Sequence, residues 1–188
     1  MLLLIDNYDS FTYNLVQLAG CITTEIIVVR NDQFTITEIA ELNPTHIILS
    51  PGPGHPKDAG ICEDLVRYLQ GNIPILGVCL GHQGICEVYG SRITYARQLM
   101  HGKKSLLKID THCPIFHGLP SHIEAGRYHS LAASGDTIPD DLQVVAEDHQ
   151  GEVMAVQHKT FPVYGVQFHP ESILTPMGSA ILDNFLKI

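Results

Sequence analysis

The sequence feature that most constrains the fold is the segment 77–81, which reads Gly-Val-Cys-Leu-Gly. The apolar run 73–78 predicts a strand, and the pattern of residues 80–89 predicts a helix. A strand, a sharp turn and a helix in this order are typical of a nucleophile elbow, here with cysteine where many hydrolases carry serine. Glycine is expected at 77 and 81 because a Cβ at either position would crowd the strained turn.

Around this segment, short apolar runs alternate with helical patterns through the first half of the chain. Strands are predicted at 2–5, 25–30, 46–50 and 73–78, and helices at 11–18, 36–42, 59–69 and 80–89. Thr35 and Glu38 have the spacing of a capping box at the start of the second helix. This order predicts an α/β fold with a parallel sheet that helices cover on both faces.

The second half of the chain has a different pattern. Strands are predicted at 105–109, 123–128, 142–147, 153–158 and 163–168, and a closing helix at 178–186. Their alternation of polar and apolar residues predicts antiparallel additions to the sheet. No linker-like segment separates the two halves, so we expect residues 1–188 to form a single domain.

Charge and composition argue against several functional classes. A formal net charge of −9 disfavours non-specific binding to nucleic acid or to an anionic membrane. No apolar run approaches the roughly 20 residues that span a bilayer, and the apolar start meets Asp6 too early for a signal peptide. Five cysteines at irregular spacing predict free thiols in a reducing, cytoplasmic setting.

A cysteine nucleophile needs a base and a group that orients the base. At the elbow, Cys79 would lie at a helix N-terminus, whose partial positive charge favours the thiolate. His169 and Glu171 follow the predicted strand 163–168 at i and i+2, so both can project to the same side. His169 would then deprotonate Cys79 and Glu171 would orient His169. The tripeptide alone also allows a surface histidine beside a solvated glutamate.

Acyl chemistry also needs an oxyanion hole, and the backbone N–H of Leu80 is one natural donor. The loop 51–54 could supply another, since Gly52 and Gly54 let the backbone approach a ligand while Pro53 stiffens the loop. The same loop could equally be a turn with no chemical role. Both segments follow strands of a parallel sheet, whose carboxyl ends meet at the edge where ligands bind.

A metal site is a weaker interpretation of the same region. Cys79, His82 and Cys86 could supply three ligands, but a structural site needs four and the neighbouring sequence offers no convincing fourth. Cys86 lies among apolar residues, which makes a buried core position the simpler account. We therefore expect no metal and no cofactor.

Four motifs extend this interpretation to a known family. They are residues 50–54 (SPGPG), 77–83 (GVCLGHQ), 127–131 (RYHSL) and 165–172 (GVQFHPES). In this order they resemble the class I, triad-type glutamine amidotransferases. That resemblance implies an open, mostly parallel sheet with a flavodoxin-like core. Further segments, at 6–14, 29–32, 101–103 and 172–175, resemble the amidotransferase subunits of chorismate-aminating synthases, which make anthranilate or aminodeoxychorismate.

The resemblance implies a reaction and a set of site residues. L-Glutamine would be hydrolysed through a thioester on Cys79, with His169 as base and then acid. The residues implied to line the glutamine site are Gly52, Pro53, Gly54, Leu80, Gln83, Ser130 and Leu131. The ammonia would pass to a chorismate-binding synthase subunit, which makes that subunit the expected partner.

Three alternatives remain open at this point. The chain could be the glutaminase of another synthase of the same fold, for example one that makes GMP. It could be a cysteine hydrolase that cleaves γ-glutamyl bonds without a partner. It could also be an inactive binding subunit, which the presence of Cys79, His169 and Glu171 disfavours.

Overall fold

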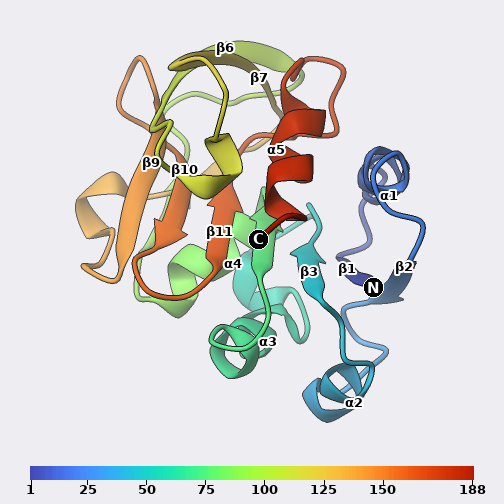
Figure 1. The fold of residues 1–188 in the computed structure, drawn as a ribbon. Coiled ribbons are helices and arrows are strands. Elements are labelled where there is room, and N and C mark those ends of the chain that lie inside the picture. Colours follow the sequence, from blue (N-terminus) through green and yellow to red (C-terminus); the bar gives the residue numbers. More distant parts are fainter.

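The computed structural model describes residues 1–188, and one nine-stranded sheet of order β2-β1-β3-β4-β11-β10-β9-β6-β7 runs through it (Figure 1). Its strands are β1 Leu2–Asp6, β2 Ile26–Arg30, β3 His46–Leu49, β4 Ile75–Val78, β6 Lys103–Ile109, β7 His122–Arg127, β9 Leu142–Asp148, β10 Val153–His158 and β11 Val163–Val166. Neighbours from β2 to β11 pair in parallel, and neighbours from β11 to β7 pair antiparallel. The predicted α/β class, with a parallel first half and antiparallel additions, is therefore confirmed.

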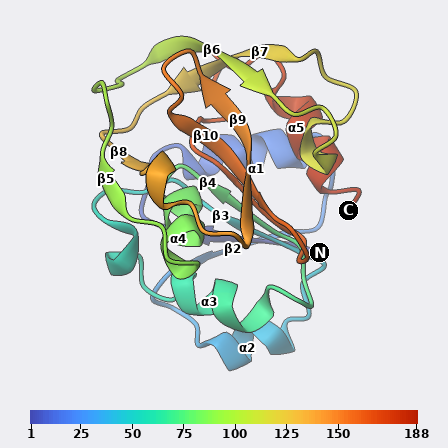
Figure 2. The ribbon, with the colours of Figure 1, turned by 90° about the vertical axis from the view of Figure 1, so that its left-hand side faces the viewer.

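Helices cover both faces of the parallel strands. They are α1 Thr12–Gly20, α2 Ile36–Glu41, α3 Cys62–Leu69, α4 Leu80–Val88 and α5 Gly178–Phe185. Leu2 and Leu4 of β1 pack with α1 and α5, whereas Leu3 and Ile5 pack with α2, α3 and α4. This alternation along one strand produces two cores, one on each face, as the arrangement of the helices in Figure 2 shows.

The register of the parallel strands aligns their carboxyl ends. Ile5 lies opposite Leu49, Leu49 lies opposite Gly77, and Gly77 lies opposite Gly165. The segments that follow β1, β3, β4 and β11 consequently leave the sheet at one edge. This brings together four segments that are far apart in the sequence.

Most predicted elements lie within a few residues of the observed ones, including the capping box, in which Thr35 accepts from the Glu38 backbone and Glu38 accepts from Thr35. One pairing differs from the expectation. The sequence predicts antiparallel pairing for the strand at 163–168, and β11 does pair antiparallel with β10, but it also pairs in parallel with β4 and ends at Val166. It joins the two halves of the sheet, a role that local alternation does not encode.

Two elements were missed. The short strands β5 Ile93–Tyr95 and β8 Leu131–Ala133 form a separate two-stranded sheet, and three residues are too few for a periodic signal. Three 3₁₀ turns complete the chain: η1 Pro56–Asp58, η2 Pro114–Phe116 and η3 Gly135–Thr137. No helix combines the length and the apolar character that crossing a membrane would require.

Candidate active site

Cys79 occupies a strained turn between β4 and α4. Its φ of 52° and ψ of −99° lie outside the regions that a non-glycine residue normally adopts. A Cβ on Gly77 would lie 2.4 Å from the carbonyl carbon of Gly81, and a Cβ on Gly81 would lie 2.5 Å from the carbonyl oxygen of Leu49. The predicted elbow is therefore present, and its two glycines are required by close backbone approach.

His169 lies in the segment after β11 and is held by backbone contacts. Its N–H donates to the carbonyl of Gly126 at 3.0 Å, and the hydroxyl of Thr175 donates to its carbonyl at 2.7 Å. Its imidazole packs against the rings of Phe11 and Tyr128, at centroid distances of 5.3 and 4.9 Å. These contacts leave the ring few orientations.

Glu171 orients the imidazole as the i, i+2 spacing predicted. The Nδ1 of His169 lies 2.7 Å from Oε1 of Glu171, and the Glu171 side chain is completely buried. A buried carboxylate on Nδ1 places the proton of the neutral ring on that nitrogen, which leaves Nε2 unprotonated. Nε2 makes no hydrogen bond to the protein, so it is open to take a proton.

The charges around His169 favour its protonated form. Burial by itself lowers the pKa of this imidazole, but the neighbouring Cys79 and Glu171 outweigh burial and raise the pKa to about 10. The sulfur of Cys79 is close enough to have this effect, although it lacks hydrogen-bond geometry with Nε2. The site can therefore hold a positively charged imidazolium next to the sulfur of Cys79.

A pocket of about 280 Å³ opens beside Cys79. Its walls are formed by Asp9, Gly52, Pro53, Gly54, Cys79, Gln83, Tyr128, His129, Ser130 and Leu131. All of the residues expected at the glutamine site line this pocket except Leu80. Leu80 begins α4 directly after Cys79, and its side chain packs so closely on Gly52 that a Cβ there would lie 2.6 Å from Leu80 Cδ2.

The loop at residues 51–54 is held in place by Asn7, which is buried. The backbone N–H of Asn7 donates to Oγ of Ser50 and its side-chain Nδ2 donates to the carbonyl of Ser50, both at 2.8 Å. Asn31 and Cys62 in turn donate to Oδ1 of Asn7. The loop is therefore rigidly connected to the ends of β1 and β2, as a binding loop needs to be.

The match to a known family rests on almost the whole chain. The model of the family described as glutamine amidotransferase class-I matches residues 3–188. The chain belongs to the class-I glutamine amidotransferases.

Two curated relatives and one solved structure illustrate the range of this family. The aminodeoxychorismate/anthranilate synthase component 2 of Bacillus subtilis is 49% identical over 187 residues, which cover 100% of this amidotransferase chain and 96% of that protein. The bifunctional protein TrpGD of Thermotoga maritima is 49% identical over 188 residues, but this chain spans only 32% of its length. A crystal structure of a protein assigned as a GMP synthase subunit, from Thermoplasma acidophilum, has a TM-score of 0.88 and 27% identity, and the match covers 99% of this chain and 92% of that one.

Several residues of the amidotransferase site carried no catalytic or glutamine-binding role in the sequence interpretation. Asp9, Tyr128 and His129 line the pocket, and Gln167 donates through Nε2 toward Sγ of Cys79 at 3.6 Å. Gln167 had a detectable signal, because it is polar in an apolar run and lies two residues before His169, on the same side of an extended chain. The other three lie in motifs whose local pattern does not show which way a side chain points.

Three of the remaining cysteines, Cys62, Cys86 and Cys113, are buried core residues, whereas Cys21 is exposed. Burial raises the pKa of Cys62 and of Cys113 to about 12, and it also raises the pKa of Cys86. His82, fully buried, has its pKa lowered to about 4 by burial. Cys86 and His82 thus lie in the packed interior behind the elbow.

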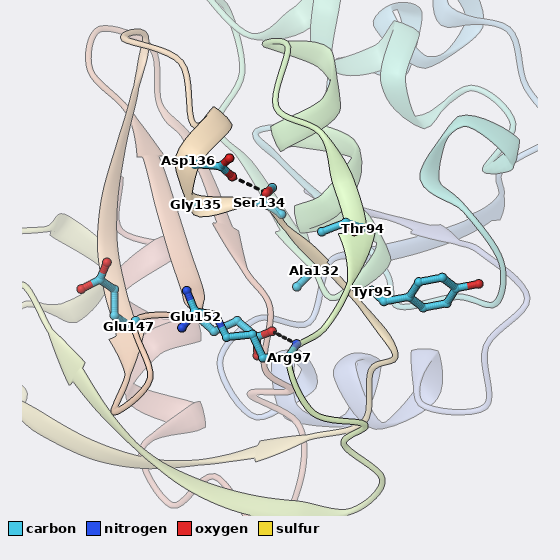
Figure 3. Close-up of a pocket in the computed structure, with 11 residues that line it drawn as sticks. Thr94, Tyr95, Arg97, Ala132, Ser134, Gly135, Asp136, Glu147 and Glu152 are labelled. Carbon is cyan, nitrogen blue, oxygen red and sulfur yellow. Dashed lines mark hydrogen bonds between the residues drawn. The ribbon is translucent and has the colours of Figure 1, made fainter.

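A second cavity, of about 330 Å³, is separate from the elbow (Figure 3). Thr94 and Tyr95 of β5 contribute to its wall, together with Arg97, Glu147 and Glu152. It includes none of Cys79, His169 and Glu171. The candidate nucleophile, Cys79, lines the smaller pocket instead.

Proposed function

We propose that this chain is the glutaminase component of a chorismate-aminating synthase. It hydrolyses L-glutamine to glutamate and ammonia and delivers the ammonia to a chorismate-binding synthase subunit. The observation that carries the reaction is the His169 imidazole, oriented by Glu171 and electrostatically coupled to Cys79, which lines the pocket. The product class is supported by relatives named component 2 of anthranilate and aminodeoxychorismate synthases, which are 45–49% identical over essentially the full chain.

The reaction proceeds in two halves on Cys79. The thiolate attacks the side-chain amide carbon of glutamine, and the carbon–nitrogen bond breaks as protonated His169 gives its proton to the leaving ammonia. A water molecule, deprotonated by His169, then attacks the thioester and releases glutamate and the thiolate. In both halves a negative oxygen forms, and the backbone N–H groups of Leu80 and of the loop at Gly52 and Gly54 are the donors we assign to it.

The remaining pocket residues are assigned to binding glutamine. The Nε2 of Gln83 donates to the carbonyl of Leu131 and to Oε1 of Gln167, at 2.9 and 3.1 Å. Gln83 is therefore left with its own Oε1 to meet the substrate. The backbone of Ser130 and Leu131 lies on the wall of the same pocket, where it can pair with the α-amino and α-carboxylate groups. Pro53 stiffens the opposite wall.

The partner follows from the chemistry of ammonia. In bulk water ammonia becomes protonated and is no longer a nucleophile, so a synthase subunit has to receive it directly. Relatives named component 2 support a separate synthase component. We also assign residues 1–188 to a single glutamine amidotransferase domain, which the family match over 3–188 and the continuous sheet support. Five unpaired cysteines support a reducing, cytoplasmic location.

The function is tested by two assays on one preparation. The chain is mixed with component I of anthranilate synthase or of aminodeoxychorismate synthase, and glutamate release and aminated product are measured from glutamine and chorismate. We expect product with at least one of these components, and faster glutamate release in its presence, because partner binding often completes a catalytic site. Glutamate release that is as fast without a partner as with one would instead support a stand-alone hydrolase. A third mixture contains a GMP-forming synthase subunit and its own acceptor substrate; product there, and with neither component I, would support the other glutaminase alternative.

Replacement of Glu171 by glutamine tests the orienting role. We expect kcat/KM for glutamine to fall about a hundredfold, the lower end of what general acid–base catalysis contributes. Because Glu171 helps raise the pKa of His169 to about 10, its loss lowers that pKa, and the alkaline fall in activity shifts to lower pH. The measurement is a pH–rate profile of both proteins. An unchanged alkaline limb would show that Glu171 does not act on His169.

A further inference from the structure

A buried arginine lies one residue away from the pocket wall. The side chain of Arg127, at the end of β7, is completely buried. Its Nη1 donates to Oδ2 of Asp148 at 2.7 Å, and its Nη2 pairs with Oε2 of Glu152. Two carboxylates hold the guanidinium in place where it could not remain alone, since an unpaired buried charge is strongly unfavourable.

Arg127 also donates through Nη1 to Oγ of Ser105 at 3.3 Å, and a further contact is directed toward the pocket. Its Nε donates to Nε2 of His129 at 3.1 Å. A guanidinium does not lose its protons in a protein, so Nε2 of His129 has to accept and cannot carry hydrogen. The proton of His129 is therefore on Nδ1, which donates to the carbonyl of Leu131 at 2.9 Å.

The contacts continue from Leu131 to the nucleophile. The carbonyl of Leu131 accepts a second hydrogen bond from Nε2 of Gln83 at 2.9 Å. Gln83 also donates to Oε1 of Gln167, and Nε2 of Gln167 donates toward Sγ of Cys79. A series of hydrogen bonds thus connects the guanidinium to the sulfur. The two bonds that His129 makes in this series depend on which of its ring nitrogens carries the proton.

We propose that Arg127 is a positioning residue that holds His129 in the neutral Nδ1–H tautomer, and thereby fixes the Ser130–Leu131 wall that receives the substrate. The inference rests on the proposed function only in naming that substrate as glutamine. If His129 were protonated on both nitrogens, its Nε2–H would face the Nε–H of Arg127, and the hydrogen bond between the two side chains would be lost. The hydrogen bond from Arg127 to His129 keeps the Ser130–Leu131 wall in one arrangement at every pH at which the enzyme works.

Most of the surroundings of His129 act against a second proton. Burial and then the charge of Arg127 lower the pKa of His129 to about 3, and they outweigh the hydrogen bond to the Leu131 carbonyl, which raises it. His82 and His169 are the other titratable groups that face it, and both also disfavour a positive ring. Arg127 itself is fixed on its far side through Glu152, whose Oε1 accepts from the backbone N–H of Arg97 (Figure 3).

The first test uses the unmodified protein. Two-dimensional ¹⁵N NMR of the histidine ring nitrogens distinguishes the two neutral tautomers and the charged form. We expect His129 to remain neutral with its proton on Nδ1 across the whole range in which an ordinary histidine, with a pKa of about 6.5, would titrate. A proton on Nε2, or titration of His129 near neutral pH, would overturn the proposal. This result does not depend on any enzymatic activity.

The second test removes the guanidinium without leaving a buried charge. It combines Arg127→Met with Asp148→Asn and Glu152→Gln. In this variant we expect the His129 pKa to rise, and KM for glutamine to increase about tenfold and to worsen as the pH falls, with a smaller change in kcat. Arg67→Met is the matched control, because Arg67 also pairs with two carboxylates, at 2.8 and 3.0 Å, but on the exposed face of α3. The control should keep the wild-type KM.

A third pair of variants applies even if the triple variant does not fold. The side-chain nitrogen of His129→Asn can take the place of Nδ1 and donate to Leu131, whereas His129→Leu cannot. We expect the asparagine variant to keep KM close to the wild-type value and the leucine variant to raise it about tenfold. Equal KM values for the two variants would overturn the proposal. Absence of glutamine hydrolysis in the wild type would refute the proposed function instead, while the NMR measurement would still decide the tautomer.

Discussion

Replacement of Cys79 by serine is expected to abolish use of glutamine while leaving the partner able to use ammonia. The thiolate is the nucleophile, and a serine hydroxyl in the same position stays protonated because its pKa is far higher than that of a thiol. Loss of a nucleophile from a catalytic triad lowers kcat by roughly 10⁴-fold or more. The synthase subunit carries out the amination itself, so an added ammonium salt should restore product formation from chorismate.

The experiment compares glutamate release and product formation with glutamine or with an ammonium salt, in the presence of the synthase component. Cys21→Ser is the matched control, since Cys21 is an exposed free thiol that is not part of the lining of the Cys79 pocket. It should retain full activity with both nitrogen sources. Loss of ammonia-dependent product in Cys79→Ser would contradict the division of labour between the two subunits. Retention of glutamine-dependent product would contradict the role of Cys79.

Replacement of Gly81 by alanine is expected to destabilise the protein severely. A Cβ at this position would lie 2.5 Å from the carbonyl oxygen and 2.7 Å from the Cβ of Leu49. Leu49 belongs to β3, a strand buried between β1 and β4, so its backbone cannot move aside without disturbing the sheet. We expect a loss of about 3 kcal/mol in the free energy of unfolding, at the upper end of what overpacking normally costs.

Gly84 provides the matched control in the same helix. A Cβ there would meet nothing closer than 3.7 Å, and alanine is the better helix former. Gly84→Ala should therefore raise stability by about 0.5–1 kcal/mol. Urea unfolding monitored by circular dichroism measures both variants against the wild type, with the change read from the midpoint at constant slope. Equal stabilities for the two variants would show that the elbow does not need the close approach.

Local pattern predicted the elements that carry the chemistry. The apolar run before Cys79 and the helical pattern after it sufficed for the elbow, because strand, turn and helix are each determined by a few neighbouring residues. The His169–Glu171 contact was expected from the two-residue spacing, and it is present, although the chain turns here and the N–H of Ser172 donates to the carbonyl of His169. The short strands β5 and β8 gave no comparable signal, and Leu131, the first residue of β8, was therefore located only through the family resemblance.

The partner and the direction of each strand in the sheet could not be predicted from local sequence pattern. The strand at 163–168 is an almost continuous apolar run, and β11 pairs antiparallel with β10 and in parallel with β4. Partner and direction depend on strands that are many residues away, and on which edge remains available once the first strands have paired. That pairing places the residues after β11 at the same edge as Cys79.

The sequence alone determined which side chains could react and on what kind of turn they would lie: a thiol at an elbow and an imidazole next to a carboxylate. The tertiary structure decided that the imidazole and the carboxylate come together next to the thiol, which lines a pocket, and that Arg127 is paired with Asp148 and Glu152 and donates to His129. The reason is physical. Conformation along the chain depends on near neighbours, whereas the strand register and the balance of buried charge are set by contacts between residues distant in the sequence.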